Sequence, residues 1–130
     1  MITAAGSHQF AVSQSSTDPL SVGRLAPNTP HDAANVWSTL EPRSGWTVGA
    51  GFTAVSHRYA DTDNTAGVPA YVAFNAMASY QVNERCKLQL NLNNVTDKLY
   101  FTGIYYTGVQ ENHALPSAGR TLIGTASYRF

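Results

Sequence analysis

Six segments of this chain alternate apolar and polar residues with a period of two, and no other feature restricts the fold as strongly. The segments cover residues 2–12, 33–41, 45–57, 69–82, 85–95 and 120–130. A period of two is typical of a β-strand with one apolar face, whereas an amphipathic helix repeats at i, i+3, i+4 and i+7. The helical pattern is not sustained anywhere in the chain. The sequence therefore predicts an all-β protein of about six strands.

The two faces of these predicted strands differ sharply in composition. Over the last five segments, 23 of the 27 even-numbered positions are hydrophobic and none is charged. Only six of the 23 odd-numbered positions are hydrophobic, and most others are Thr, Asn, Gln, Ser or Gly. Such a polar face, in which only Lys87 and Arg129 are charged, suits the crowded lumen of a membrane barrel better than open solvent. We therefore expect lipid to meet the even-numbered side chains, among them Phe52, Phe74, Leu88, Leu90 and Leu92.

Short and long connections alternate between the segments. Tight turns at residues 41–45 and 82–85 alternate with long polar stretches at 13–30, 58–68 and 96–119. This asymmetry is typical of barrels with short inner turns and long outer loops. The predicted fold is thus an antiparallel transmembrane β-barrel fragment of six meandering strands. Because even small barrels need roughly eight strands, the first and last segments are expected to be unpaired edges.

The composition excludes several functional classes. Charged residues make up 12% of the chain and the net charge is zero, without the basic patch of a nucleic-acid binder. Cys86 is the only cysteine, so an intrachain disulfide cannot form. No nucleophile elbow or paired carboxylates indicate an enzyme. The histidines lack metal-ligand spacing and are interpreted as rim and loop residues, so no metal or cofactor is expected; they are His8, His31, His57 and His113.

Several motifs resemble one family of membrane proteins. The Asn-rich stretch ending in Asn94, Asp97, Lys98 and Tyr100 resembles the penultimate strand of TonB-dependent outer-membrane receptors. The segment 116–130 is similar to their closing strand. The stretches 25–37 and 58–71 are similar to the siderophore-receptor branch. Val95-Thr96 and Ser117-Ala118-Gly119 depart from the usual residues of these motifs.

The resemblance implies a place in a larger protein. Members of this family carry a signal peptide and a plug domain before a barrel of about 22 strands. Residues 1–130 match only about the last six strands, and no plug domain or signal peptide is expected in them. The parent would import ferric siderophores across the outer membrane, and TonB would act only through the missing plug. The other partners that the resemblance implies are outer-membrane lipid and the barrel-assembly machinery.

The same resemblance suggests roles for individual residues. A terminal aromatic helps the assembly machinery to recognise the last strand, so Phe130 and Tyr128 are interpreted as an assembly signal. Tyr105, Tyr106 and His113 lie in the long loop 96–119. In the siderophore branch, aromatic loop residues pack against the flat faces of catecholate or hydroxamate groups. These three residues are therefore the candidate ligand contacts.

Two alternatives stay open at this point. A short structural or pore-forming protein could build an outer-membrane barrel from several copies of this chain. A soluble β-sandwich binding module also alternates apolar and polar residues, although its outer faces usually carry many charges.

Overall fold

A computed structural model describes residues 1–9, 11–12, 22–106 and 112–130. Within these ranges, no helix is long and apolar enough to cross a membrane. The regular elements are all strands, and six of them are long. The long strands are β1 (Ile2–His8), β2 (Asp32–Arg43), β3 (Trp46–Val55), β6 (Tyr71–Asn83), β7 (Cys86–Asn93) and β10 (Thr121–Tyr128).

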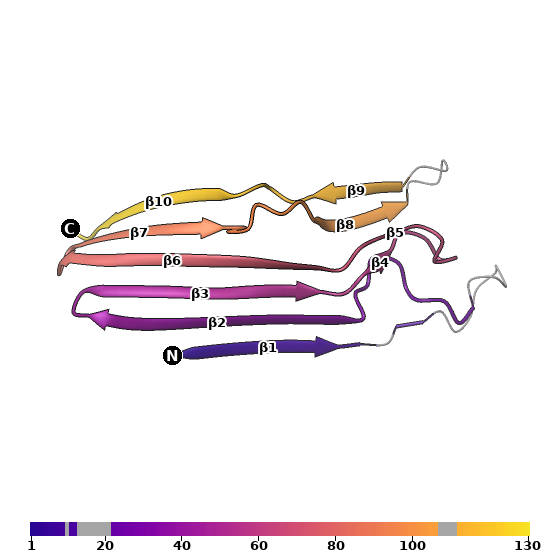
Figure 1. Ribbon diagram of the computed structural model, residues 1–130, viewed down its shortest axis with the longest axis horizontal. Helices are drawn as coiled ribbons and strands as arrows, with labels where there is room; N and C mark the ends of the chain where they lie inside the picture. The colour runs from indigo at the N-terminus through magenta and orange to yellow at the C-terminus, as the bar shows by residue number, and fades with distance from the viewer. Residues whose placement is uncertain (10, 13–21, 107–111) are drawn as a thin grey trace.

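The long strands form one antiparallel sheet in the order β1-β2-β3-β6-β7-β10 (Figure 1). The prediction of six meandering strands is confirmed, and the bounds of the last five differ from the predicted ones by about two residues at most. β1 ends at His8, earlier than the predicted residue 12, and residue 10 lies outside the described residues. β1 and β10 are the two edges of the sheet, as the sequence predicted.

The sheet is a single layer, and within the described ranges no second sheet covers either of its faces (Figure 1). The arrangement therefore differs from a β-sandwich, in which two sheets pack face to face. Each edge strand presents a row of backbone groups that no neighbouring strand pairs, and proteins rarely leave such edges open. The sheet thus has the form of a segment that further strands would continue.

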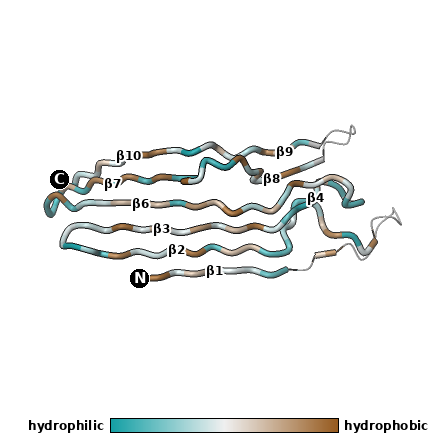
Figure 2. Tube along the Cα trace, in the orientation of Figure 1, coloured by the Kyte–Doolittle hydropathy of each residue, from teal (hydrophilic) through white to brown (hydrophobic). Residues whose placement is uncertain are grey.

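The strand register gathers the even-numbered residues on one face. Val36 pairs with Phe52, and Phe52 pairs with Phe74. Toward the β10 edge of the sheet, Leu92 pairs with both Ala76 and Leu122. Because directly opposite residues point to the same face, the apolar positions of all six strands form one continuous surface. The resulting alternation along the long strands is visible in Figure 2.

The apolar face is the more exposed of the two. Phe74, Leu88 and Leu90 are 45%, 46% and 53% exposed, whereas Ala73 and Ser79 on the opposite face are each 3% exposed. A sheet that folds in water hides its apolar side chains and exposes its polar ones. In this sheet the apolar face is exposed and side chains of the polar face are buried.

Trp37 is an apolar residue on the polar face, and two glycines of β3 explain how it fits. It pairs directly with Gly51, and its ring also lies against Gly49. A Cβ at Gly51 would lie 2.3 Å from the carbonyl oxygen of Val36 and 2.5 Å from the Trp37 side chain. A Cβ at Gly49 would lie 2.8 Å from the same ring. The glycines therefore make room for the indole to lie flat on the neighbouring strand.

The two short turns lie at the end of the sheet opposite to the long loops (Figure 1). Gly45, in the turn between β2 and β3, has φ +81°, a conformation that glycine adopts at little cost. In the turn between β6 and β7, the Asn83 side chain accepts hydrogen bonds of 2.9 Å from the amides of Arg85 and Cys86. Trp46 and Tyr80 lie opposite each other near these turns, with ring centroids 4.8 Å apart.

The Asn-x-x-Asp-Lys motif joins the end of β7 to the start of β10. Asn94 is 3% exposed and has φ +50°. Its Nδ2 donates to the carbonyls of Lys98 and Ala118 at 2.9 and 3.1 Å, and its Oδ1 accepts from the Lys98 amide at 3.1 Å. The Asp97 carboxylate accepts from the Arg120 amide at 2.7 Å. The motif therefore fixes the geometry at which the chain leaves one strand and enters the next.

Candidate ligand-binding loops

The long connections contain two hairpins that the sequence analysis treated as loops. Residues 58–68 include β4 (Arg58–Tyr59) and β5 (Gly67–Val68), and residues 96–119 include β8 (Phe101–Tyr106) and β9 (Asn112–Pro116). Each pair forms a two-stranded antiparallel sheet. The sequence predicted the long connections but not the short strands within them, and β4 and β5, with two residues each, are too short to show a period of two.

A small apolar core joins the two hairpins. Ala60, Val68 and Ile104 are 3%, 5% and 4% exposed and contact one another. Phe101 and Ala114 pack against them. Since Ala60 and Val68 come from the first hairpin and Ile104 from the second, the two hairpins pack as one body at the loop end of the sheet (Figure 1).

Arg58 adds a polar connection between the same hairpins. This residue is 7% exposed, and its two terminal nitrogens donate to the carbonyls of Thr102 and Phe101 at 2.6 and 2.7 Å. Among the described residues, Arg58 Nε and Asp63 Oδ1 are buried side-chain atoms without a hydrogen-bond partner. Charge-assisted hydrogen bonds from a buried guanidinium are stronger than those between neutral groups, so Arg58 holds β8 against β4. The sequence offered no signal for this contact.

A third segment, close to the start of β2, also reaches this cluster. The Asn28 amide donates to the Tyr59 carbonyl at 2.7 Å, and Asn28 Oδ1 accepts from the Ile104 amide at 3.3 Å. The Asn64 side chain exchanges hydrogen bonds of 2.8 and 3.0 Å with the backbone of Leu25. We call the hairpins β4–β5 and β8–β9, together with residues 25–28, the loop cluster. Described parts of all three long connections thus meet at one end of the sheet.

Asp61 organises the tip of the first hairpin. Its carboxylate accepts hydrogen bonds from the hydroxyl and, at 2.9 Å, from the amide of Thr65. Burial raises the pKa of the Asp61 carboxyl, but the hydrogen bonds from Thr65 and from the Ala66 amide outweigh this effect and keep the pKa below its ordinary value. The charged form of Asp61 therefore stabilises the turn.

The predicted ligand contacts lie on the second hairpin. Tyr105 of β8 pairs with His113 of β9, and their rings stack with centroids 5.7 Å apart and planes at 20°. Tyr105 is 46% exposed. Tyr106 pairs with Asn112 through the backbone, and its side chain lies outside the described part of the molecule. The structure thus brings Tyr105 and His113 together and leaves an aromatic surface open.

Other predicted site residues lie on the sheet. Tyr128 ends β10, and Phe130 follows it fully exposed, with the two rings in edge contact at 5.3 Å. Phe52, Phe74, Leu88, Leu90 and Leu92 all belong to the apolar face that the register defines.

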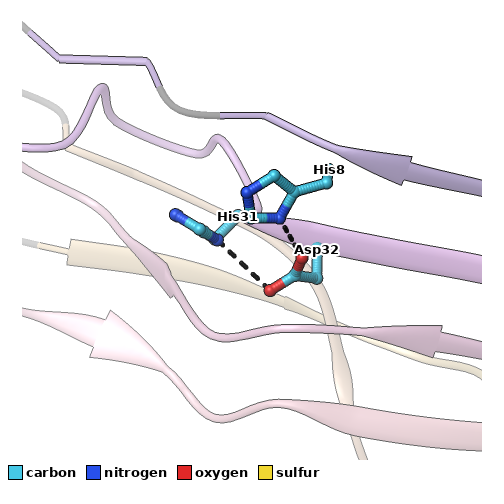
Figure 3. A group of neighbouring side chains, drawn as sticks. All are labelled: His8, His31 and Asp32. Carbon is cyan, nitrogen blue, oxygen red and sulfur yellow. Dashed lines mark hydrogen bonds and ion pairs between the residues drawn. The ribbon is translucent and has the colours of Figure 1, made fainter.

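Two of the histidines, which are widely spaced in the sequence, come together in the structure. His8 and His31 lie with ring centroids 4.6 Å apart and both contact Asp32 (Figure 3). His57 instead contacts the ring of Tyr59 at 5.1 Å. Residues 8 and 32 are far apart in the sequence, so only the pairing of β1 with β2 could reveal this cluster.

Comparison with known proteins identifies the family. Residues 3–95 match the family described as TonB dependent receptor-like, beta-barrel. The chain is 39% identical over 108 residues to the probable TonB-dependent siderophore receptor PiuA of Acinetobacter baumannii, and 31% identical over 108 residues to the catecholate siderophore receptor Fiu of Escherichia coli K12. These alignments cover 83% and 80% of the chain and 14% of each relative. The chain therefore spans a small part of the length of these receptors.

Solved structures agree with this result. The structure of PiuA from Acinetobacter baumannii superimposes with a TM-score of 0.82 at 33% identity, over 98% of this chain and 19% of that protein. The closed form of the ferric-catecholate import receptor Fiu from E. coli K12 gives the same TM-score at 25% identity, over 99% of this chain and 18% of that protein. The sheet and the loop cluster thus correspond to part of a receptor barrel, and the chain belongs to the TonB-dependent receptor family.

Proposed function

We propose that this chain forms the C-terminal part of the barrel of an outer-membrane receptor that imports ferric siderophores. The observation that carries the proposal is the register, which gathers exposed apolar side chains on one face over six strands. Lipid would cover this face, and the polar face would line the lumen. Relatives whose names include siderophore receptors support the nature of the cargo.

The partners of the proposed receptor follow from this arrangement. β1 would pair with a preceding strand and β10 with the first strand of the barrel, which removes both open edges. TonB would supply energy through the plug domain of the complete receptor. The loop cluster would lie outside the cell and receive the ferric chelate. In this role the protein acts as a receptor and passage for its cargo, without a catalytic step.

The stacked rings of Tyr105 and His113 are the proposed contact with the chelate. An exposed aromatic surface on a hairpin whose base is packed against its neighbours can contact the flat rings of a catecholate. The neighbouring contacts of Ile104 and Arg58 hold the hairpin in place, so the rings are presented with little loss of conformational freedom on binding. Tyr106, the next residue of the same strand, is proposed as a further contact with the chelate.

Replacing Tyr105 and Tyr106 together by alanine in the complete receptor should weaken binding of a ferric catecholate. Each lost ring contact is worth about 0.5–1.5 kcal/mol, so the dissociation constant should rise roughly 5- to 150-fold. Binding of the radiolabelled ferric chelate to whole cells measures it. The control is Leu115→Ala, which removes an exposed apolar side chain from the same hairpin. Unchanged affinity in the double variant would remove these tyrosines from the proposed site.

Deleting Phe130 should lower the amount of receptor in the outer membrane. The proposed reason is that the terminal aromatic, together with Tyr128, helps the assembly machinery to recognise β10. The amount of surface-exposed receptor can be measured by labelling intact cells. Phe130→Tyr keeps an aromatic ring at the terminus and serves as the control. Equal surface levels for the deletion and the natural sequence would contradict the assembly role.

A further inference from the structure

Three side chains that commonly bind transition metals meet at the loop end of β1 and β2. His8 is the last residue of β1, and Asp32 is the first residue of β2. The two are directly opposite in the antiparallel register. His31 precedes Asp32 in the chain, and its ring is directed at the same carboxylate (Figure 3). We call these three residues the His–Asp cluster.

The distances in the His–Asp cluster are close to those of a metal site. Nδ1 of His8 lies 2.5 Å from Asp32 Oδ1, and Nδ1 of His31 lies 3.2 Å from Asp32 Oδ2. One ligand atom from each residue can be chosen so that all three lie within 4.8 Å of one another. Ligands around a tetrahedral Zn²⁺ are about 3.3 Å apart, because each bond is about 2.0–2.1 Å long. Small side-chain rotations would therefore suffice to surround an ion.

The side chains have the freedom to make these rotations. The side chains of His8 and Asp32 are 69% and 62% exposed, whereas that of His31 is 29% exposed. The backbone at Asp32 is held in place, because the Asp32 amide donates to the Ser56 hydroxyl at 3.0 Å and the Ser56 amide donates to the Asp32 carbonyl at 2.9 Å. A fixed backbone with movable side chains brings the ligands together at little entropic cost.

The chemistry of the donors selects a class of ion. Two imidazole nitrogens and one carboxylate suit Zn²⁺ and related transition metals, whereas Mg²⁺ and Ca²⁺ prefer oxygen ligands alone. In the part of the chain that the structure describes, the ion pairs of Asp32 are formed with these two histidines. The carboxylate is therefore held by groups that can become ligands together with it.

The cluster also has room for a further ligand. His8 and Asp32 line an open groove of about 700 Å³ together with the small residues Gly6, Ala34 and Ala54, and the larger side chains of Tyr71 and Lys98 line it as well. The small side chains leave space beside the carboxylate, so a water molecule could complete a four-coordinate site. His8 and Asp32 are even-numbered, like Gly6, Ala34 and Ala54, which places these two ligands at the loop end of the apolar face and away from the proposed lumen.

We propose that His8, His31 and Asp32 bind one divalent transition-metal ion of the Zn²⁺ class. The ion links the edge strand β1 to β2 at the loop end of the sheet. Because it binds the paired strands and not the separated ones, it stabilises this pairing by mass action. The site is distinct from the proposed transport of a ferric chelate, since it lies on the opposite face, and it can exist whether or not the protein imports siderophores.

Titration of the detergent-solubilised, metal-free protein with Zn²⁺ against a chromophoric chelator tests the proposal. We expect one site per chain. His8→Gln, His31→Gln and Asp32→Asn should each weaken Zn²⁺ binding at least about tenfold. The matched control is His57→Gln, which changes a histidine outside the cluster and should leave the affinity unchanged. Co²⁺ bound to the natural protein should give the intense visible absorption of a four-coordinate site.

Three results would overturn the site. The natural protein could bind Zn²⁺ no more tightly than the Asp32→Asn variant, the His57→Gln control could lose as much affinity as the cluster variants, or Co²⁺ could give only weak six-coordinate bands. His31 lies outside the strands, so His31→Gln decides the question even if His8→Gln disturbs the pairing of β1 with β2. Circular dichroism of each variant verifies that the sheet is retained.

Discussion

Replacing Leu90 by arginine should lower the free energy of unfolding in a lipid bilayer by about 2–4 kcal/mol. Leu90 lies near the middle of β7, on the apolar face, and is 53% exposed. Its cross-strand neighbours are Ala78 and Gly124, neither of which can pair with a charge. At the proposed depth in the membrane, the guanidinium would face hydrocarbon without a counter-ion. Denaturant unfolding of the complete receptor in phospholipid vesicles, followed by tryptophan fluorescence, measures the loss.

The adjacent residue supplies a matched control for this prediction. Gln89 points to the opposite face, where its cross-strand neighbours are Ser79 and Thr125. Its side chain already hydrogen-bonds to Asn91 at 3.0 Å, so this surface accommodates polar groups. Gln89→Arg should therefore have a small effect. Equal losses for Leu90→Arg and Gln89→Arg would contradict the proposal that the even-numbered face meets lipid.

Replacing Asn94 by alanine should cost about 2–4 kcal/mol of stability. The change removes three hydrogen bonds of a side chain that is 3% exposed and leaves the backbone groups of Lys98 and Ala118 without these partners. It also forces an alanine to adopt φ +50°, which asparagine and glycine tolerate better. Because the motif sets the path from β7 to β10, the loss should be accompanied by weaker protection of β10 amides in hydrogen exchange.

Two further variants separate the causes of this loss. Asn94→Gly removes the same hydrogen bonds but keeps the positive φ without strain, so it should cost less than Asn94→Ala by about 1 kcal/mol. Asn93→Ala changes an exposed neighbour and should have little effect. If Asn94→Ala were as stable as Asn93→Ala, the motif would not hold the two strands together.

The long strands could be predicted from the sequence because their signal is local. β6 covers thirteen residues, and its alternation from Tyr71 to Asn83 is long enough to distinguish a strand from a helix. Even positions also stay apolar in β3, β7 and β10, so the two faces follow without knowledge of the pairing partners. The two open edges were predictable from the number of strands, since six strands are too few to close a barrel.

The loop cluster could not be predicted in this way. β4 and β5 contain two residues each, and such strands form because neighbouring hairpins bury Ala60, Val68 and Ile104 together. Arg58 donates hydrogen bonds to the carbonyls of Phe101 and Thr102, which lie more than forty positions away in the sequence. Tyr105, Tyr106 and His113 had been singled out through the family resemblance, but the stacking of Tyr105 on His113 depends on the register of β8 with β9.

The histidines show the same limit. Spacing along the chain suggested that His8 and His31 are unrelated, whereas the pairing of β1 with β2 places both beside Asp32. Conversely, the Asn94 motif was recognised as a pattern, but its physical role became clear only from its hydrogen bonds to the start of β10.

The sequence by itself determined which residues form strands and which face of each strand is apolar, because both depend on a period of two between near neighbours. The tertiary structure alone decided which residues lie opposite one another, how the long connections pack together, and where His8, His31 and Asp32 meet. These features depend on the register between strands that are distant in the sequence. Register is fixed by the hydrogen-bonded pairing of whole strands, and a single strand carries no record of its partner.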